Sequence, residues 1–187
     1  MRSPLPRGMR SDVGGGRIAV RNVVLGLIVL VAALVTGLKG FSQEMPNTAG
    51  ETLSGKRIVL AEQVRGHAVV LVAGFSHEAG NGTAAWVKAI HADPALASAS
   101  VYEIAEIAGA PSLIRGMIKS GMKKGVPAAE QDYFVVLTED AKLWRNYFDV
   151  GDDQVPYVML LDPSGKILWH GHGSASDLEA QLKGALH

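Results

Sequence analysis

The sequence predicts an α/β fold in which a central mixed sheet carries helices on both faces and an N-terminal hydrophobic helix precedes it. The first observation is the apolar run Ala68–Phe75, which suits a central strand covered on both sides. The second is the alternation of strand-like and helix-like segments after residue 56, which is typical of such sheets. The third is an uncharged apolar stretch, Val23–Leu38.

Composition divides the chain into four segments. Residues 1–22 are rich in glycine, proline and arginine, and we expect this basic N-terminus to be disordered. Residues 23–39 predict either a transmembrane anchor or a signal peptide. Residues 40–55 predict a polar linker, and residues 56–187 a globular domain long enough to bury a core.

The charge that precedes the apolar stretch predicts the location of the domain. Five arginines and one acid lie among residues 1–21. Positive charge there favours a cytoplasmic N-terminus and transfer of the following domain. We therefore expect the domain at the inner membrane facing the periplasm, or in the periplasm if residues 1–42 are cleaved. The arginine-rich, acid-poor start also suits a mitochondrial presequence.

Strands are predicted where β-branched and aromatic residues follow turn residues. The turn Pro163–Gly165 joins two of these strands into a hairpin. Besides the central strand, the predicted strands are Arg57–Leu60 at an edge, Ser100–Ile107, Tyr133–Thr138, Pro156–Asp162 and Lys166–His170.

Four helices are predicted between these strands from their start and stop signals. Thr83 can cap a helix that runs to about His91. Pro111 suits the first turn of a helix that ends near Lys124. The two remaining helices are Asp140–Phe148 and Ser176–Leu186.

The charge balance gives no reason to expect a nucleic-acid partner. The chain has 18 basic and 18 acidic residues, of which 13 and 17 lie beyond residue 21. Nucleic acids are bound through clustered lysines and arginines, which an acidic domain does not offer. An aromatic content of 6% also provides few stacking platforms for single strands.

The order of elements and two local features resemble the thioredoxin-like superfamily, in its peroxiredoxin and cytochrome-maturation branch. In that superfamily, redox cysteines follow the central strand at the start of the first helix, where this chain has Ser76–Gly82. The segment Val155–Tyr157, followed by a strand, a turn and a strand, is similar to the superfamily's cis-proline region. The resemblance covers residues 56–187 and implies a cis Val155–Pro156 peptide bond.

A narrower likeness involves the segment Pro111–Lys124 and the strand that follows Val126 and Pro127. Together with Asp152–Val158, these residues are similar to the mitochondrial thioredoxin-like assembly factors of ATP synthase. Those proteins lack a conventional Cys-x-x-Cys motif and are thought to aid assembly of the membrane sector. The resemblance implies an assembly role without substrate turnover.

The chain contains no cysteine, which excludes thiol–disulfide exchange and thiol peroxidase activity. Both reactions need a thiolate nucleophile, whereas a serine hydroxyl is not ionised near neutral pH. The absence of cysteine also excludes thiolate zinc sites and iron–sulfur clusters. The sequence thus favours a protein that is not an enzyme.

Three side chains occupy the position of the redox cysteines, namely Ser76, His77 and Glu78. His77 and Glu78 form either part of a solvated loop or an acid–base or ligand pair at the positive end of a helix. His170 and His172 lie two residues apart, but no third ligand stands near them in the sequence. We therefore expect no metal site and no cofactor.

The predicted helix Pro111–Lys124 is amphipathic. Arg115, Lys119 and Lys123 fall opposite the apolar positions, so replacing them with glutamate should change the stability by less than about 0.5 kcal/mol. In the simpler interpretation, the apolar face packs on the sheet. In the alternative interpretation, the cationic face or the methionines meet a lipid headgroup layer or a client.

Together these observations predict a redox-inactive, membrane-associated binding or assembly factor for a membrane protein complex, with an ATP synthase as one candidate. Its expected partner is a membrane protein or a periplasmic client. The alternatives are metal or haem handling in cytochrome maturation, and a divergent non-thiol enzyme that uses the loop at His77 and Glu78. The candidate binding residues are Ser76, His77, Glu78, Arg115, Lys119, Lys123, Lys124 and Pro156.

Overall fold

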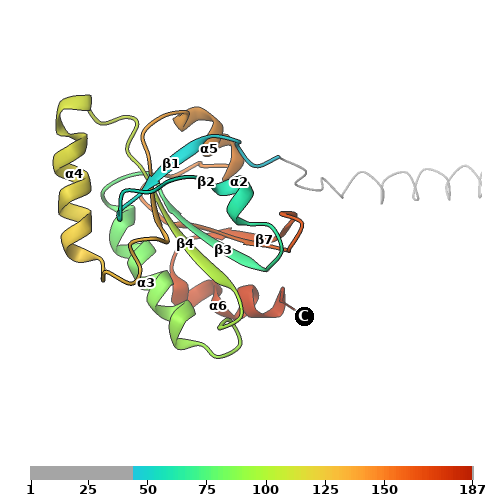
Figure 1. Cartoon of the computed structure of the whole chain (residues 1–187). Coiled ribbons are helices and arrows are strands. Elements are labelled where there is room, and N and C mark those ends of the chain that lie inside the picture. The colour runs from blue at the N-terminus through green and yellow to red at the C-terminus, as the bar shows by residue number, and fades with distance from the viewer. Residues whose placement is uncertain (1–43, 187) are drawn as a thin grey trace, which may run out of the picture. The chain divides into compact units, whose positions relative to one another are not determined.

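The computed structural model describes residues 44–186, which form a seven-stranded sheet with helices on both faces (Figure 1). The strand order is β2-β1-β5-β4-β3-β6-β7. The central strands β3, β4 and β5 are parallel neighbours, whereas every other neighbouring pair is antiparallel. The predicted mixed sheet is therefore confirmed.

The predicted alternation of strands and helices is also confirmed, and the structure adds the strand β1 and the short helix α2. The strands are β1 (Ala49–Thr52), β2 (Arg57–Val59), β3 (Val69–Gly74), β4 (Ser100–Glu106), β5 (Phe134–Leu137), β6 (Tyr157–Leu161) and β7 (Ile167–His172). The helices are α2 (Leu60–Gln63), α3 (Ala79–Ala92), α4 (Ser112–Gly125), α5 (Ala141–Tyr147) and α6 (Ala175–Gly184).

Strand β3 lies at the centre of the core, and all six of its residues are buried. Its side chains alternate between the two faces of the sheet. Leu71 packs in the core cluster that includes residues of α2 and α5, and Val72 packs in the cluster that includes residues of α3 and α6. Figure 1 shows these two pairs of helices on opposite sides of the sheet.

Strand β1 lies in the segment that the sequence suggested to be a polar linker. It pairs through its backbone with β2 and β5, and Gly50 lies so close to Val135 that a Cβ atom at this position would overlap the valine side chain. Main-chain pairing and the close approach of a glycine hold this segment in the sheet. It therefore does not need the alternating apolar pattern by which a strand is recognised in a sequence. The sheet thus extends upstream of residue 56.

The predicted N-terminal hydrophobic helix belongs to residues 1–43, which lie outside the described residues. Within residues 44–186, none of the helices has the length and apolar character that crossing a membrane requires.

The implied cis Val155–Pro156 bond is wrong, because residues 44–186 contain no cis peptide bond. Pro156 is buried and packs against the first turn of α3. A Cβ atom at Gly82 would lie 2.8 Å from Pro156 Cδ, so only glycine lets this turn approach the proline ring. Pro156 therefore serves as a packing residue beneath the connection between β3 and α3.

Helix α3 begins at Ala79, four residues before the predicted cap Thr83. Ser76 Oγ accepts a hydrogen bond from the Ala79 amide at 3.2 Å and starts the helix earlier. The two glycines of the first turn, Gly80 and Gly82, suggested a loop in the sequence. In the structure, Gly82 instead gives the helix its close contact with Pro156.

We predict that Val72→Asp prevents folding, because Val72 is fully buried in the central strand. An unpaired carboxylate there costs several kcal/mol, which is comparable to the whole stability of about 5–15 kcal/mol for a domain. Circular dichroism and thermal melting of the purified protein provide the measurement. The matched control is Leu168→Asp on the edge strand β7, where the leucine is 46% exposed and the protein should still melt cooperatively. A cooperative transition in Val72→Asp would contradict the central position of β3.

Candidate functional site

The loop between β3 and α3 holds the three side chains that stand in the position of the redox cysteines. His77 and Glu78 are exposed, and Ser76 is half-buried. Hydrogen bonds from the Glu78 backbone amide and the Ser76 hydroxyl hold the pKa of the Glu78 carboxyl below its usual value. The loop thus brings Ser76 and Glu78 together, but it presents an ionised, solvated carboxylate and no activated nucleophile.

Beneath this loop, Arg145 of α5 ties together the ends of two parallel strands. Its Nη2 donates a hydrogen bond to the Phe75 carbonyl at 3.0 Å, and its guanidinium lies 5.5 Å from the centre of the Phe75 ring. Its Nε lies 3.5 Å from Glu106 Oε2, and its Nη2 lies 3.4 Å from Asp153 Oδ2. The arginine therefore anchors the base of the loop.

Glu106, at the end of β4, is the most enclosed member of this polar cluster, with 8% of its surface exposed. Its Oε1 accepts a hydrogen bond from the Ala108 amide at 2.6 Å. One oxygen thus faces a backbone donor and the other faces Arg145, which provides partners for both oxygens of a buried carboxylate. We assign Glu106 and Arg145 a structural role.

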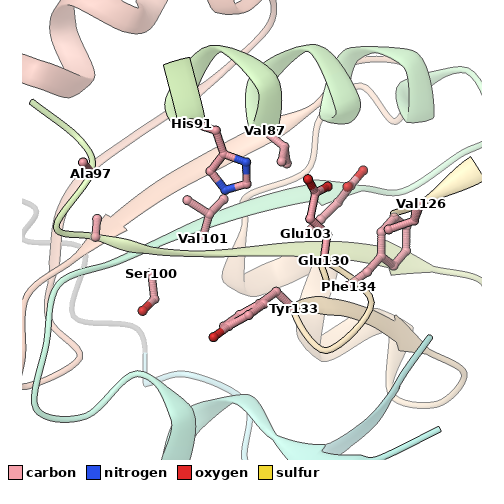
Figure 2. A pocket seen from close by; sticks show the side chains of 11 residues that line it. Val87, His91, Ala97, Ser100, Val101, Glu103, Val126, Glu130, Tyr133 and Phe134 are labelled. Atoms are coloured by element: carbon pink, nitrogen blue, oxygen red, sulfur yellow. The ribbon is translucent and has the colours of Figure 1, made fainter. Parts of the chain in front are cut away.

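A separate cavity of about 280 Å³ lies between α3, β4 and the connection from α4 to β5 (Figure 2). Val87 and His91 line it from α3, and Glu103 lines it from β4. Glu130 and Tyr133 line it from the connection. Figure 2 shows the carboxyl groups of Glu103 and Glu130 next to each other.

The Glu103 carboxyl is the perturbed titratable group of this cavity. Its Oε1 accepts a hydrogen bond from Thr83 Oγ1 at 2.6 Å. Burial raises the pKa of Glu103, the Thr83 hydroxyl lowers it, and the negative charge of Glu130 raises it. The cavity therefore holds a carboxyl that keeps its proton to higher pH than usual.

Sequence reasoning missed Glu103, although a signal was present. Glu103 and Glu106 are acids within the otherwise apolar strand β4. An acidic side chain in a strand that is covered on both faces needs a hydrogen-bond donor or a cation as its partner. Such positions are candidate functional sites. The identity of the partners, Thr83 for Glu103 and Arg145 for Glu106, depends on tertiary packing.

The predicted basic face of α4 is arranged differently from the expectation. Arg115 donates hydrogen bonds to the carbonyls of Ala110 at 2.8 Å, Thr138 at 3.1 Å and Ala108 at 2.6 Å. These contacts fix the loop before α4 to the end of β5. The prediction that Arg115 is exposed is therefore wrong.

Lys119 is likewise engaged, since it forms an ion pair with Glu51 of β1. Its expected exposure is wrong for the same reason. Lys123 and Lys124 are exposed, and no ion pair joins either ammonium to an acid of residues 44–186. Of the four predicted cations, only these two face solvent freely.

His170 and His172, which the sequence analysis considered as metal ligands, lie in β7. The His172 ring stacks at 5.4 Å on the ring of Tyr157. Among the described residues, no three histidine or acidic side chains are grouped as a metal site requires.

Solved structures with the same arrangement of elements are thioredoxin-like. The exposed lipoprotein thioredoxin Etrx1 of Streptococcus pneumoniae has a TM-score of 0.53 and 16% identity, covering 74% of this chain and 98% of its own. The putative thiol:disulfide interchange protein DsbE of Chlorobium tepidum has a TM-score of 0.52 and 20% identity, covering 80% and 98%. Yeast Sco1 has a TM-score of 0.50 and 10% identity, covering 75% and 94%. The described residues thus have a thioredoxin-like fold, and the chain contains no cysteine.

A match to a protein-family model assigns the chain to one family. Residues 39–184 match the family described as ATP10 protein, so the chain belongs to this family of ATP synthase assembly factors. None of the curated proteins compared with the chain matches it. The resemblance that the sequence suggested, to the assembly-factor branch of the thioredoxin-like superfamily, is confirmed.

We predict that Glu103→Gln stabilises the domain at neutral pH. Between the usual pKa of glutamate and the raised pKa of Glu103, the folded protein holds a proton that the unfolded chain has released, so stability falls as the pH rises. Glutamine keeps an acceptor for Thr83 and does not titrate. Thermal melting should show a higher midpoint for the variant at pH 7, and this difference should vanish below about pH 4.

The control for this prediction is Glu139→Gln, which changes an exposed glutamate outside the cavity and should leave the midpoint unchanged. A Glu103→Gln variant that melts below the parent at pH 7, but not below about pH 4, would show that the carboxylate is needed in its charged form.

We predict that Arg145→Ala destabilises the domain by about 2 kcal/mol, because it leaves the buried Glu106 carboxylate without its cation. Adding Glu106→Gln should restore part of this loss, since an amide needs no counter-charge. Chemical denaturation of the parent, both single variants and the double variant measures the coupling. If the double variant is no more stable than Arg145→Ala, the pair does not interact as described.

Proposed function

We propose that this protein is a redox-inactive assembly factor for a membrane protein complex, with the membrane sector of an ATP synthase as its client. The observation that carries the proposal is the match of residues 39–184 to a family of ATP synthase assembly factors, in a chain without cysteine. An assembly factor needs a surface that recognises a folding intermediate and does not need a reactive group.

The geometry of the loop Ser76–Glu78 supports a binding role. Ser76, His77 and Glu78 offer no activated nucleophile, and the Arg145 cluster beneath them is built from paired charges. The turn is also held firmly, because Gly82 and Pro156 are in close contact behind it. A firm, solvated, polar loop loses little conformational entropy when a partner binds.

We further propose that the protein is membrane-associated, at the inner membrane with its domain facing the periplasm. The apolar stretch Val23–Leu38 and the five arginines that precede it support this location. A location beside the membrane would place the domain next to a membrane-sector client while that client is being inserted into the membrane.

The structure reduces the set of candidate client-binding residues. Arg115 and Lys119 hold α4 to the domain, and Pro156 is buried. We therefore propose the exposed side chains of His77 and Glu78 as the client contact. Lys123 and Lys124 belong to a different surface, which is described below.

We expect the tagged full-length protein to recover ATP synthase membrane-sector subunits from detergent-solubilised membranes of its own organism. Replacing both contact residues, His77→Ala with Glu78→Ala, should reduce this recovery by about tenfold, equivalent to about 1.4 kcal/mol of binding free energy. The readout is quantitative mass spectrometry of the co-purified proteins. The matched control is Lys142→Ala with Glu139→Ala, two exposed charged residues near and in α5.

Two results would contradict the proposal. Recovery of no membrane-complex subunit by the parent protein would remove the assembly role. Reduction of insulin disulfides above background, with contaminating thioredoxin excluded, would show that the domain is redox-active. Equal recovery by the contact variant and the control would instead move the client contact away from the loop.

A further inference from the structure

Helix α4 presents its apolar side chains to solvent. Leu113 is 93% exposed and Met117 is 71% exposed, and no residue of α4 is buried. Helix α3 shows the usual arrangement, with Trp86 and Ile90 buried against the sheet. Figure 1 shows α4 standing at one side of the domain, away from the helices that cover the sheet.

Polar contacts fix this orientation. Arg115 binds three backbone carbonyls, Lys119 pairs with Glu51, and Met122 packs beside the small core cluster around Phe134. These three residues of α4 follow the spacing i, i+4 and i+7 and share one helix face. The opposite face must therefore point outward, and it carries Leu113 and Met117.

The outward face is also cationic at one end. At 100° per residue, Lys124 lies about 20° from Leu113 and about 20° from Met117 around the helix axis. Lys123 lies at the side of the helix, about 80° from Leu113, and the residues of α4 include no acid. The helix dipole explains why lysines suit the C-terminal turn, but it does not explain why leucine and methionine face water.

We name the exposed side chains of Leu113 and Met117 the apolar ridge. An apolar ridge near lysines that pair with no acid of residues 44–186 has the composition of a helix that lies in a membrane interface. Its charge complements the phosphates of anionic lipids, which attract lysines near the surface. Between Leu38 and the first residue of β1 lie ten residues, which reach at most about 35 Å. If the apolar stretch is held in a membrane, this tether keeps the domain close to the surface and strengthens a second, weak contact.

We propose that α4 docks on an anionic membrane surface, with Leu113 and Met117 inserted at the boundary between headgroups and acyl chains. Lys123 and Lys124 then contact lipid phosphates. The inference rests on the proposed membrane association, and it assigns to α4 the task of orienting the tethered domain. The client-binding loop at His77 and Glu78 remains a separate surface.

The absence of cysteine allows a direct test, because a single introduced thiol reports from one position. The full-length Met117→Cys variant is labelled with a polarity-sensitive fluorophore and reconstituted into vesicles of phosphatidylcholine with or without phosphatidylglycerol. We expect a blue shift and protection from an aqueous quencher only in the vesicles that contain phosphatidylglycerol. High salt should reverse both effects.

Matched variants make the test specific. The positional control is Leu143→Cys on α5, where the leucine is 50% exposed and the label should report water in every vesicle. In the Met117→Cys background, Lys123→Gln with Lys124→Gln should remove at least half of the shift. The charge control in the same background is Lys142→Gln, an exposed lysine of α5 that should leave the shift intact.

Three outcomes would overturn the proposal. The first is an unchanged Met117→Cys signal with anionic vesicles. The second is an equal shift at residue 143, which would mean that α4 is not the docking element. The third is a shift that appears only after a solubilised membrane-sector protein is added, which would assign the ridge to a protein partner. These vesicles contain no client, so failure here leaves the co-purification result intact, and failure of co-purification leaves this result intact.

Discussion

The structure depends on the complete burial of β3. This strand is hydrogen-bonded to β4 on one side and β6 on the other, and both of its faces are covered. An apolar strand with both edges paired can be stable only if helices cover both faces, so the chain must cross the sheet repeatedly. The same constraint brings the carboxyl ends of β3 and β4 to one edge, where the loop Ser76–Glu78 and the Glu106–Arg145 pair meet.

The domain has a thioredoxin-like fold but lacks the cysteines that carry out redox chemistry in thioredoxins. The contact between Gly82 and Pro156 closes the helix onto the loop before β6, and Arg145 links that loop to the end of β3. These contacts are steric and electrostatic, and none of them needs a thiol. A rigid loop can therefore persist as a recognition surface in a chain that has no cysteine.

Helix α4 shows how side-chain hydrogen bonding can override an amphipathic pattern. The three carbonyls near the base of α4 would lose their donors if Arg115 faced solvent, and Glu51 would lose its lysine. These directed contacts turn Arg115 and Lys119 toward the domain. The consequence is that Leu113 and Met117 are exposed, where an ordinary amphipathic helix would bury its apolar side chains.

The sequence by itself determined the α/β alternation, the central position of residues 69–74 and the absence of thiol chemistry, because apolar periodicity and residue type are local properties. Only the tertiary structure decided that Ala49–Thr52 joins the sheet, since that strand is held by main-chain pairing and by the close approach of Gly50 to Val135. It also decided the facing of α4 and the environment of Glu103, because the partners of Arg115 and Glu103 lie on other elements of the chain. Long-range contacts of this kind leave no periodic signal around the residues that make them.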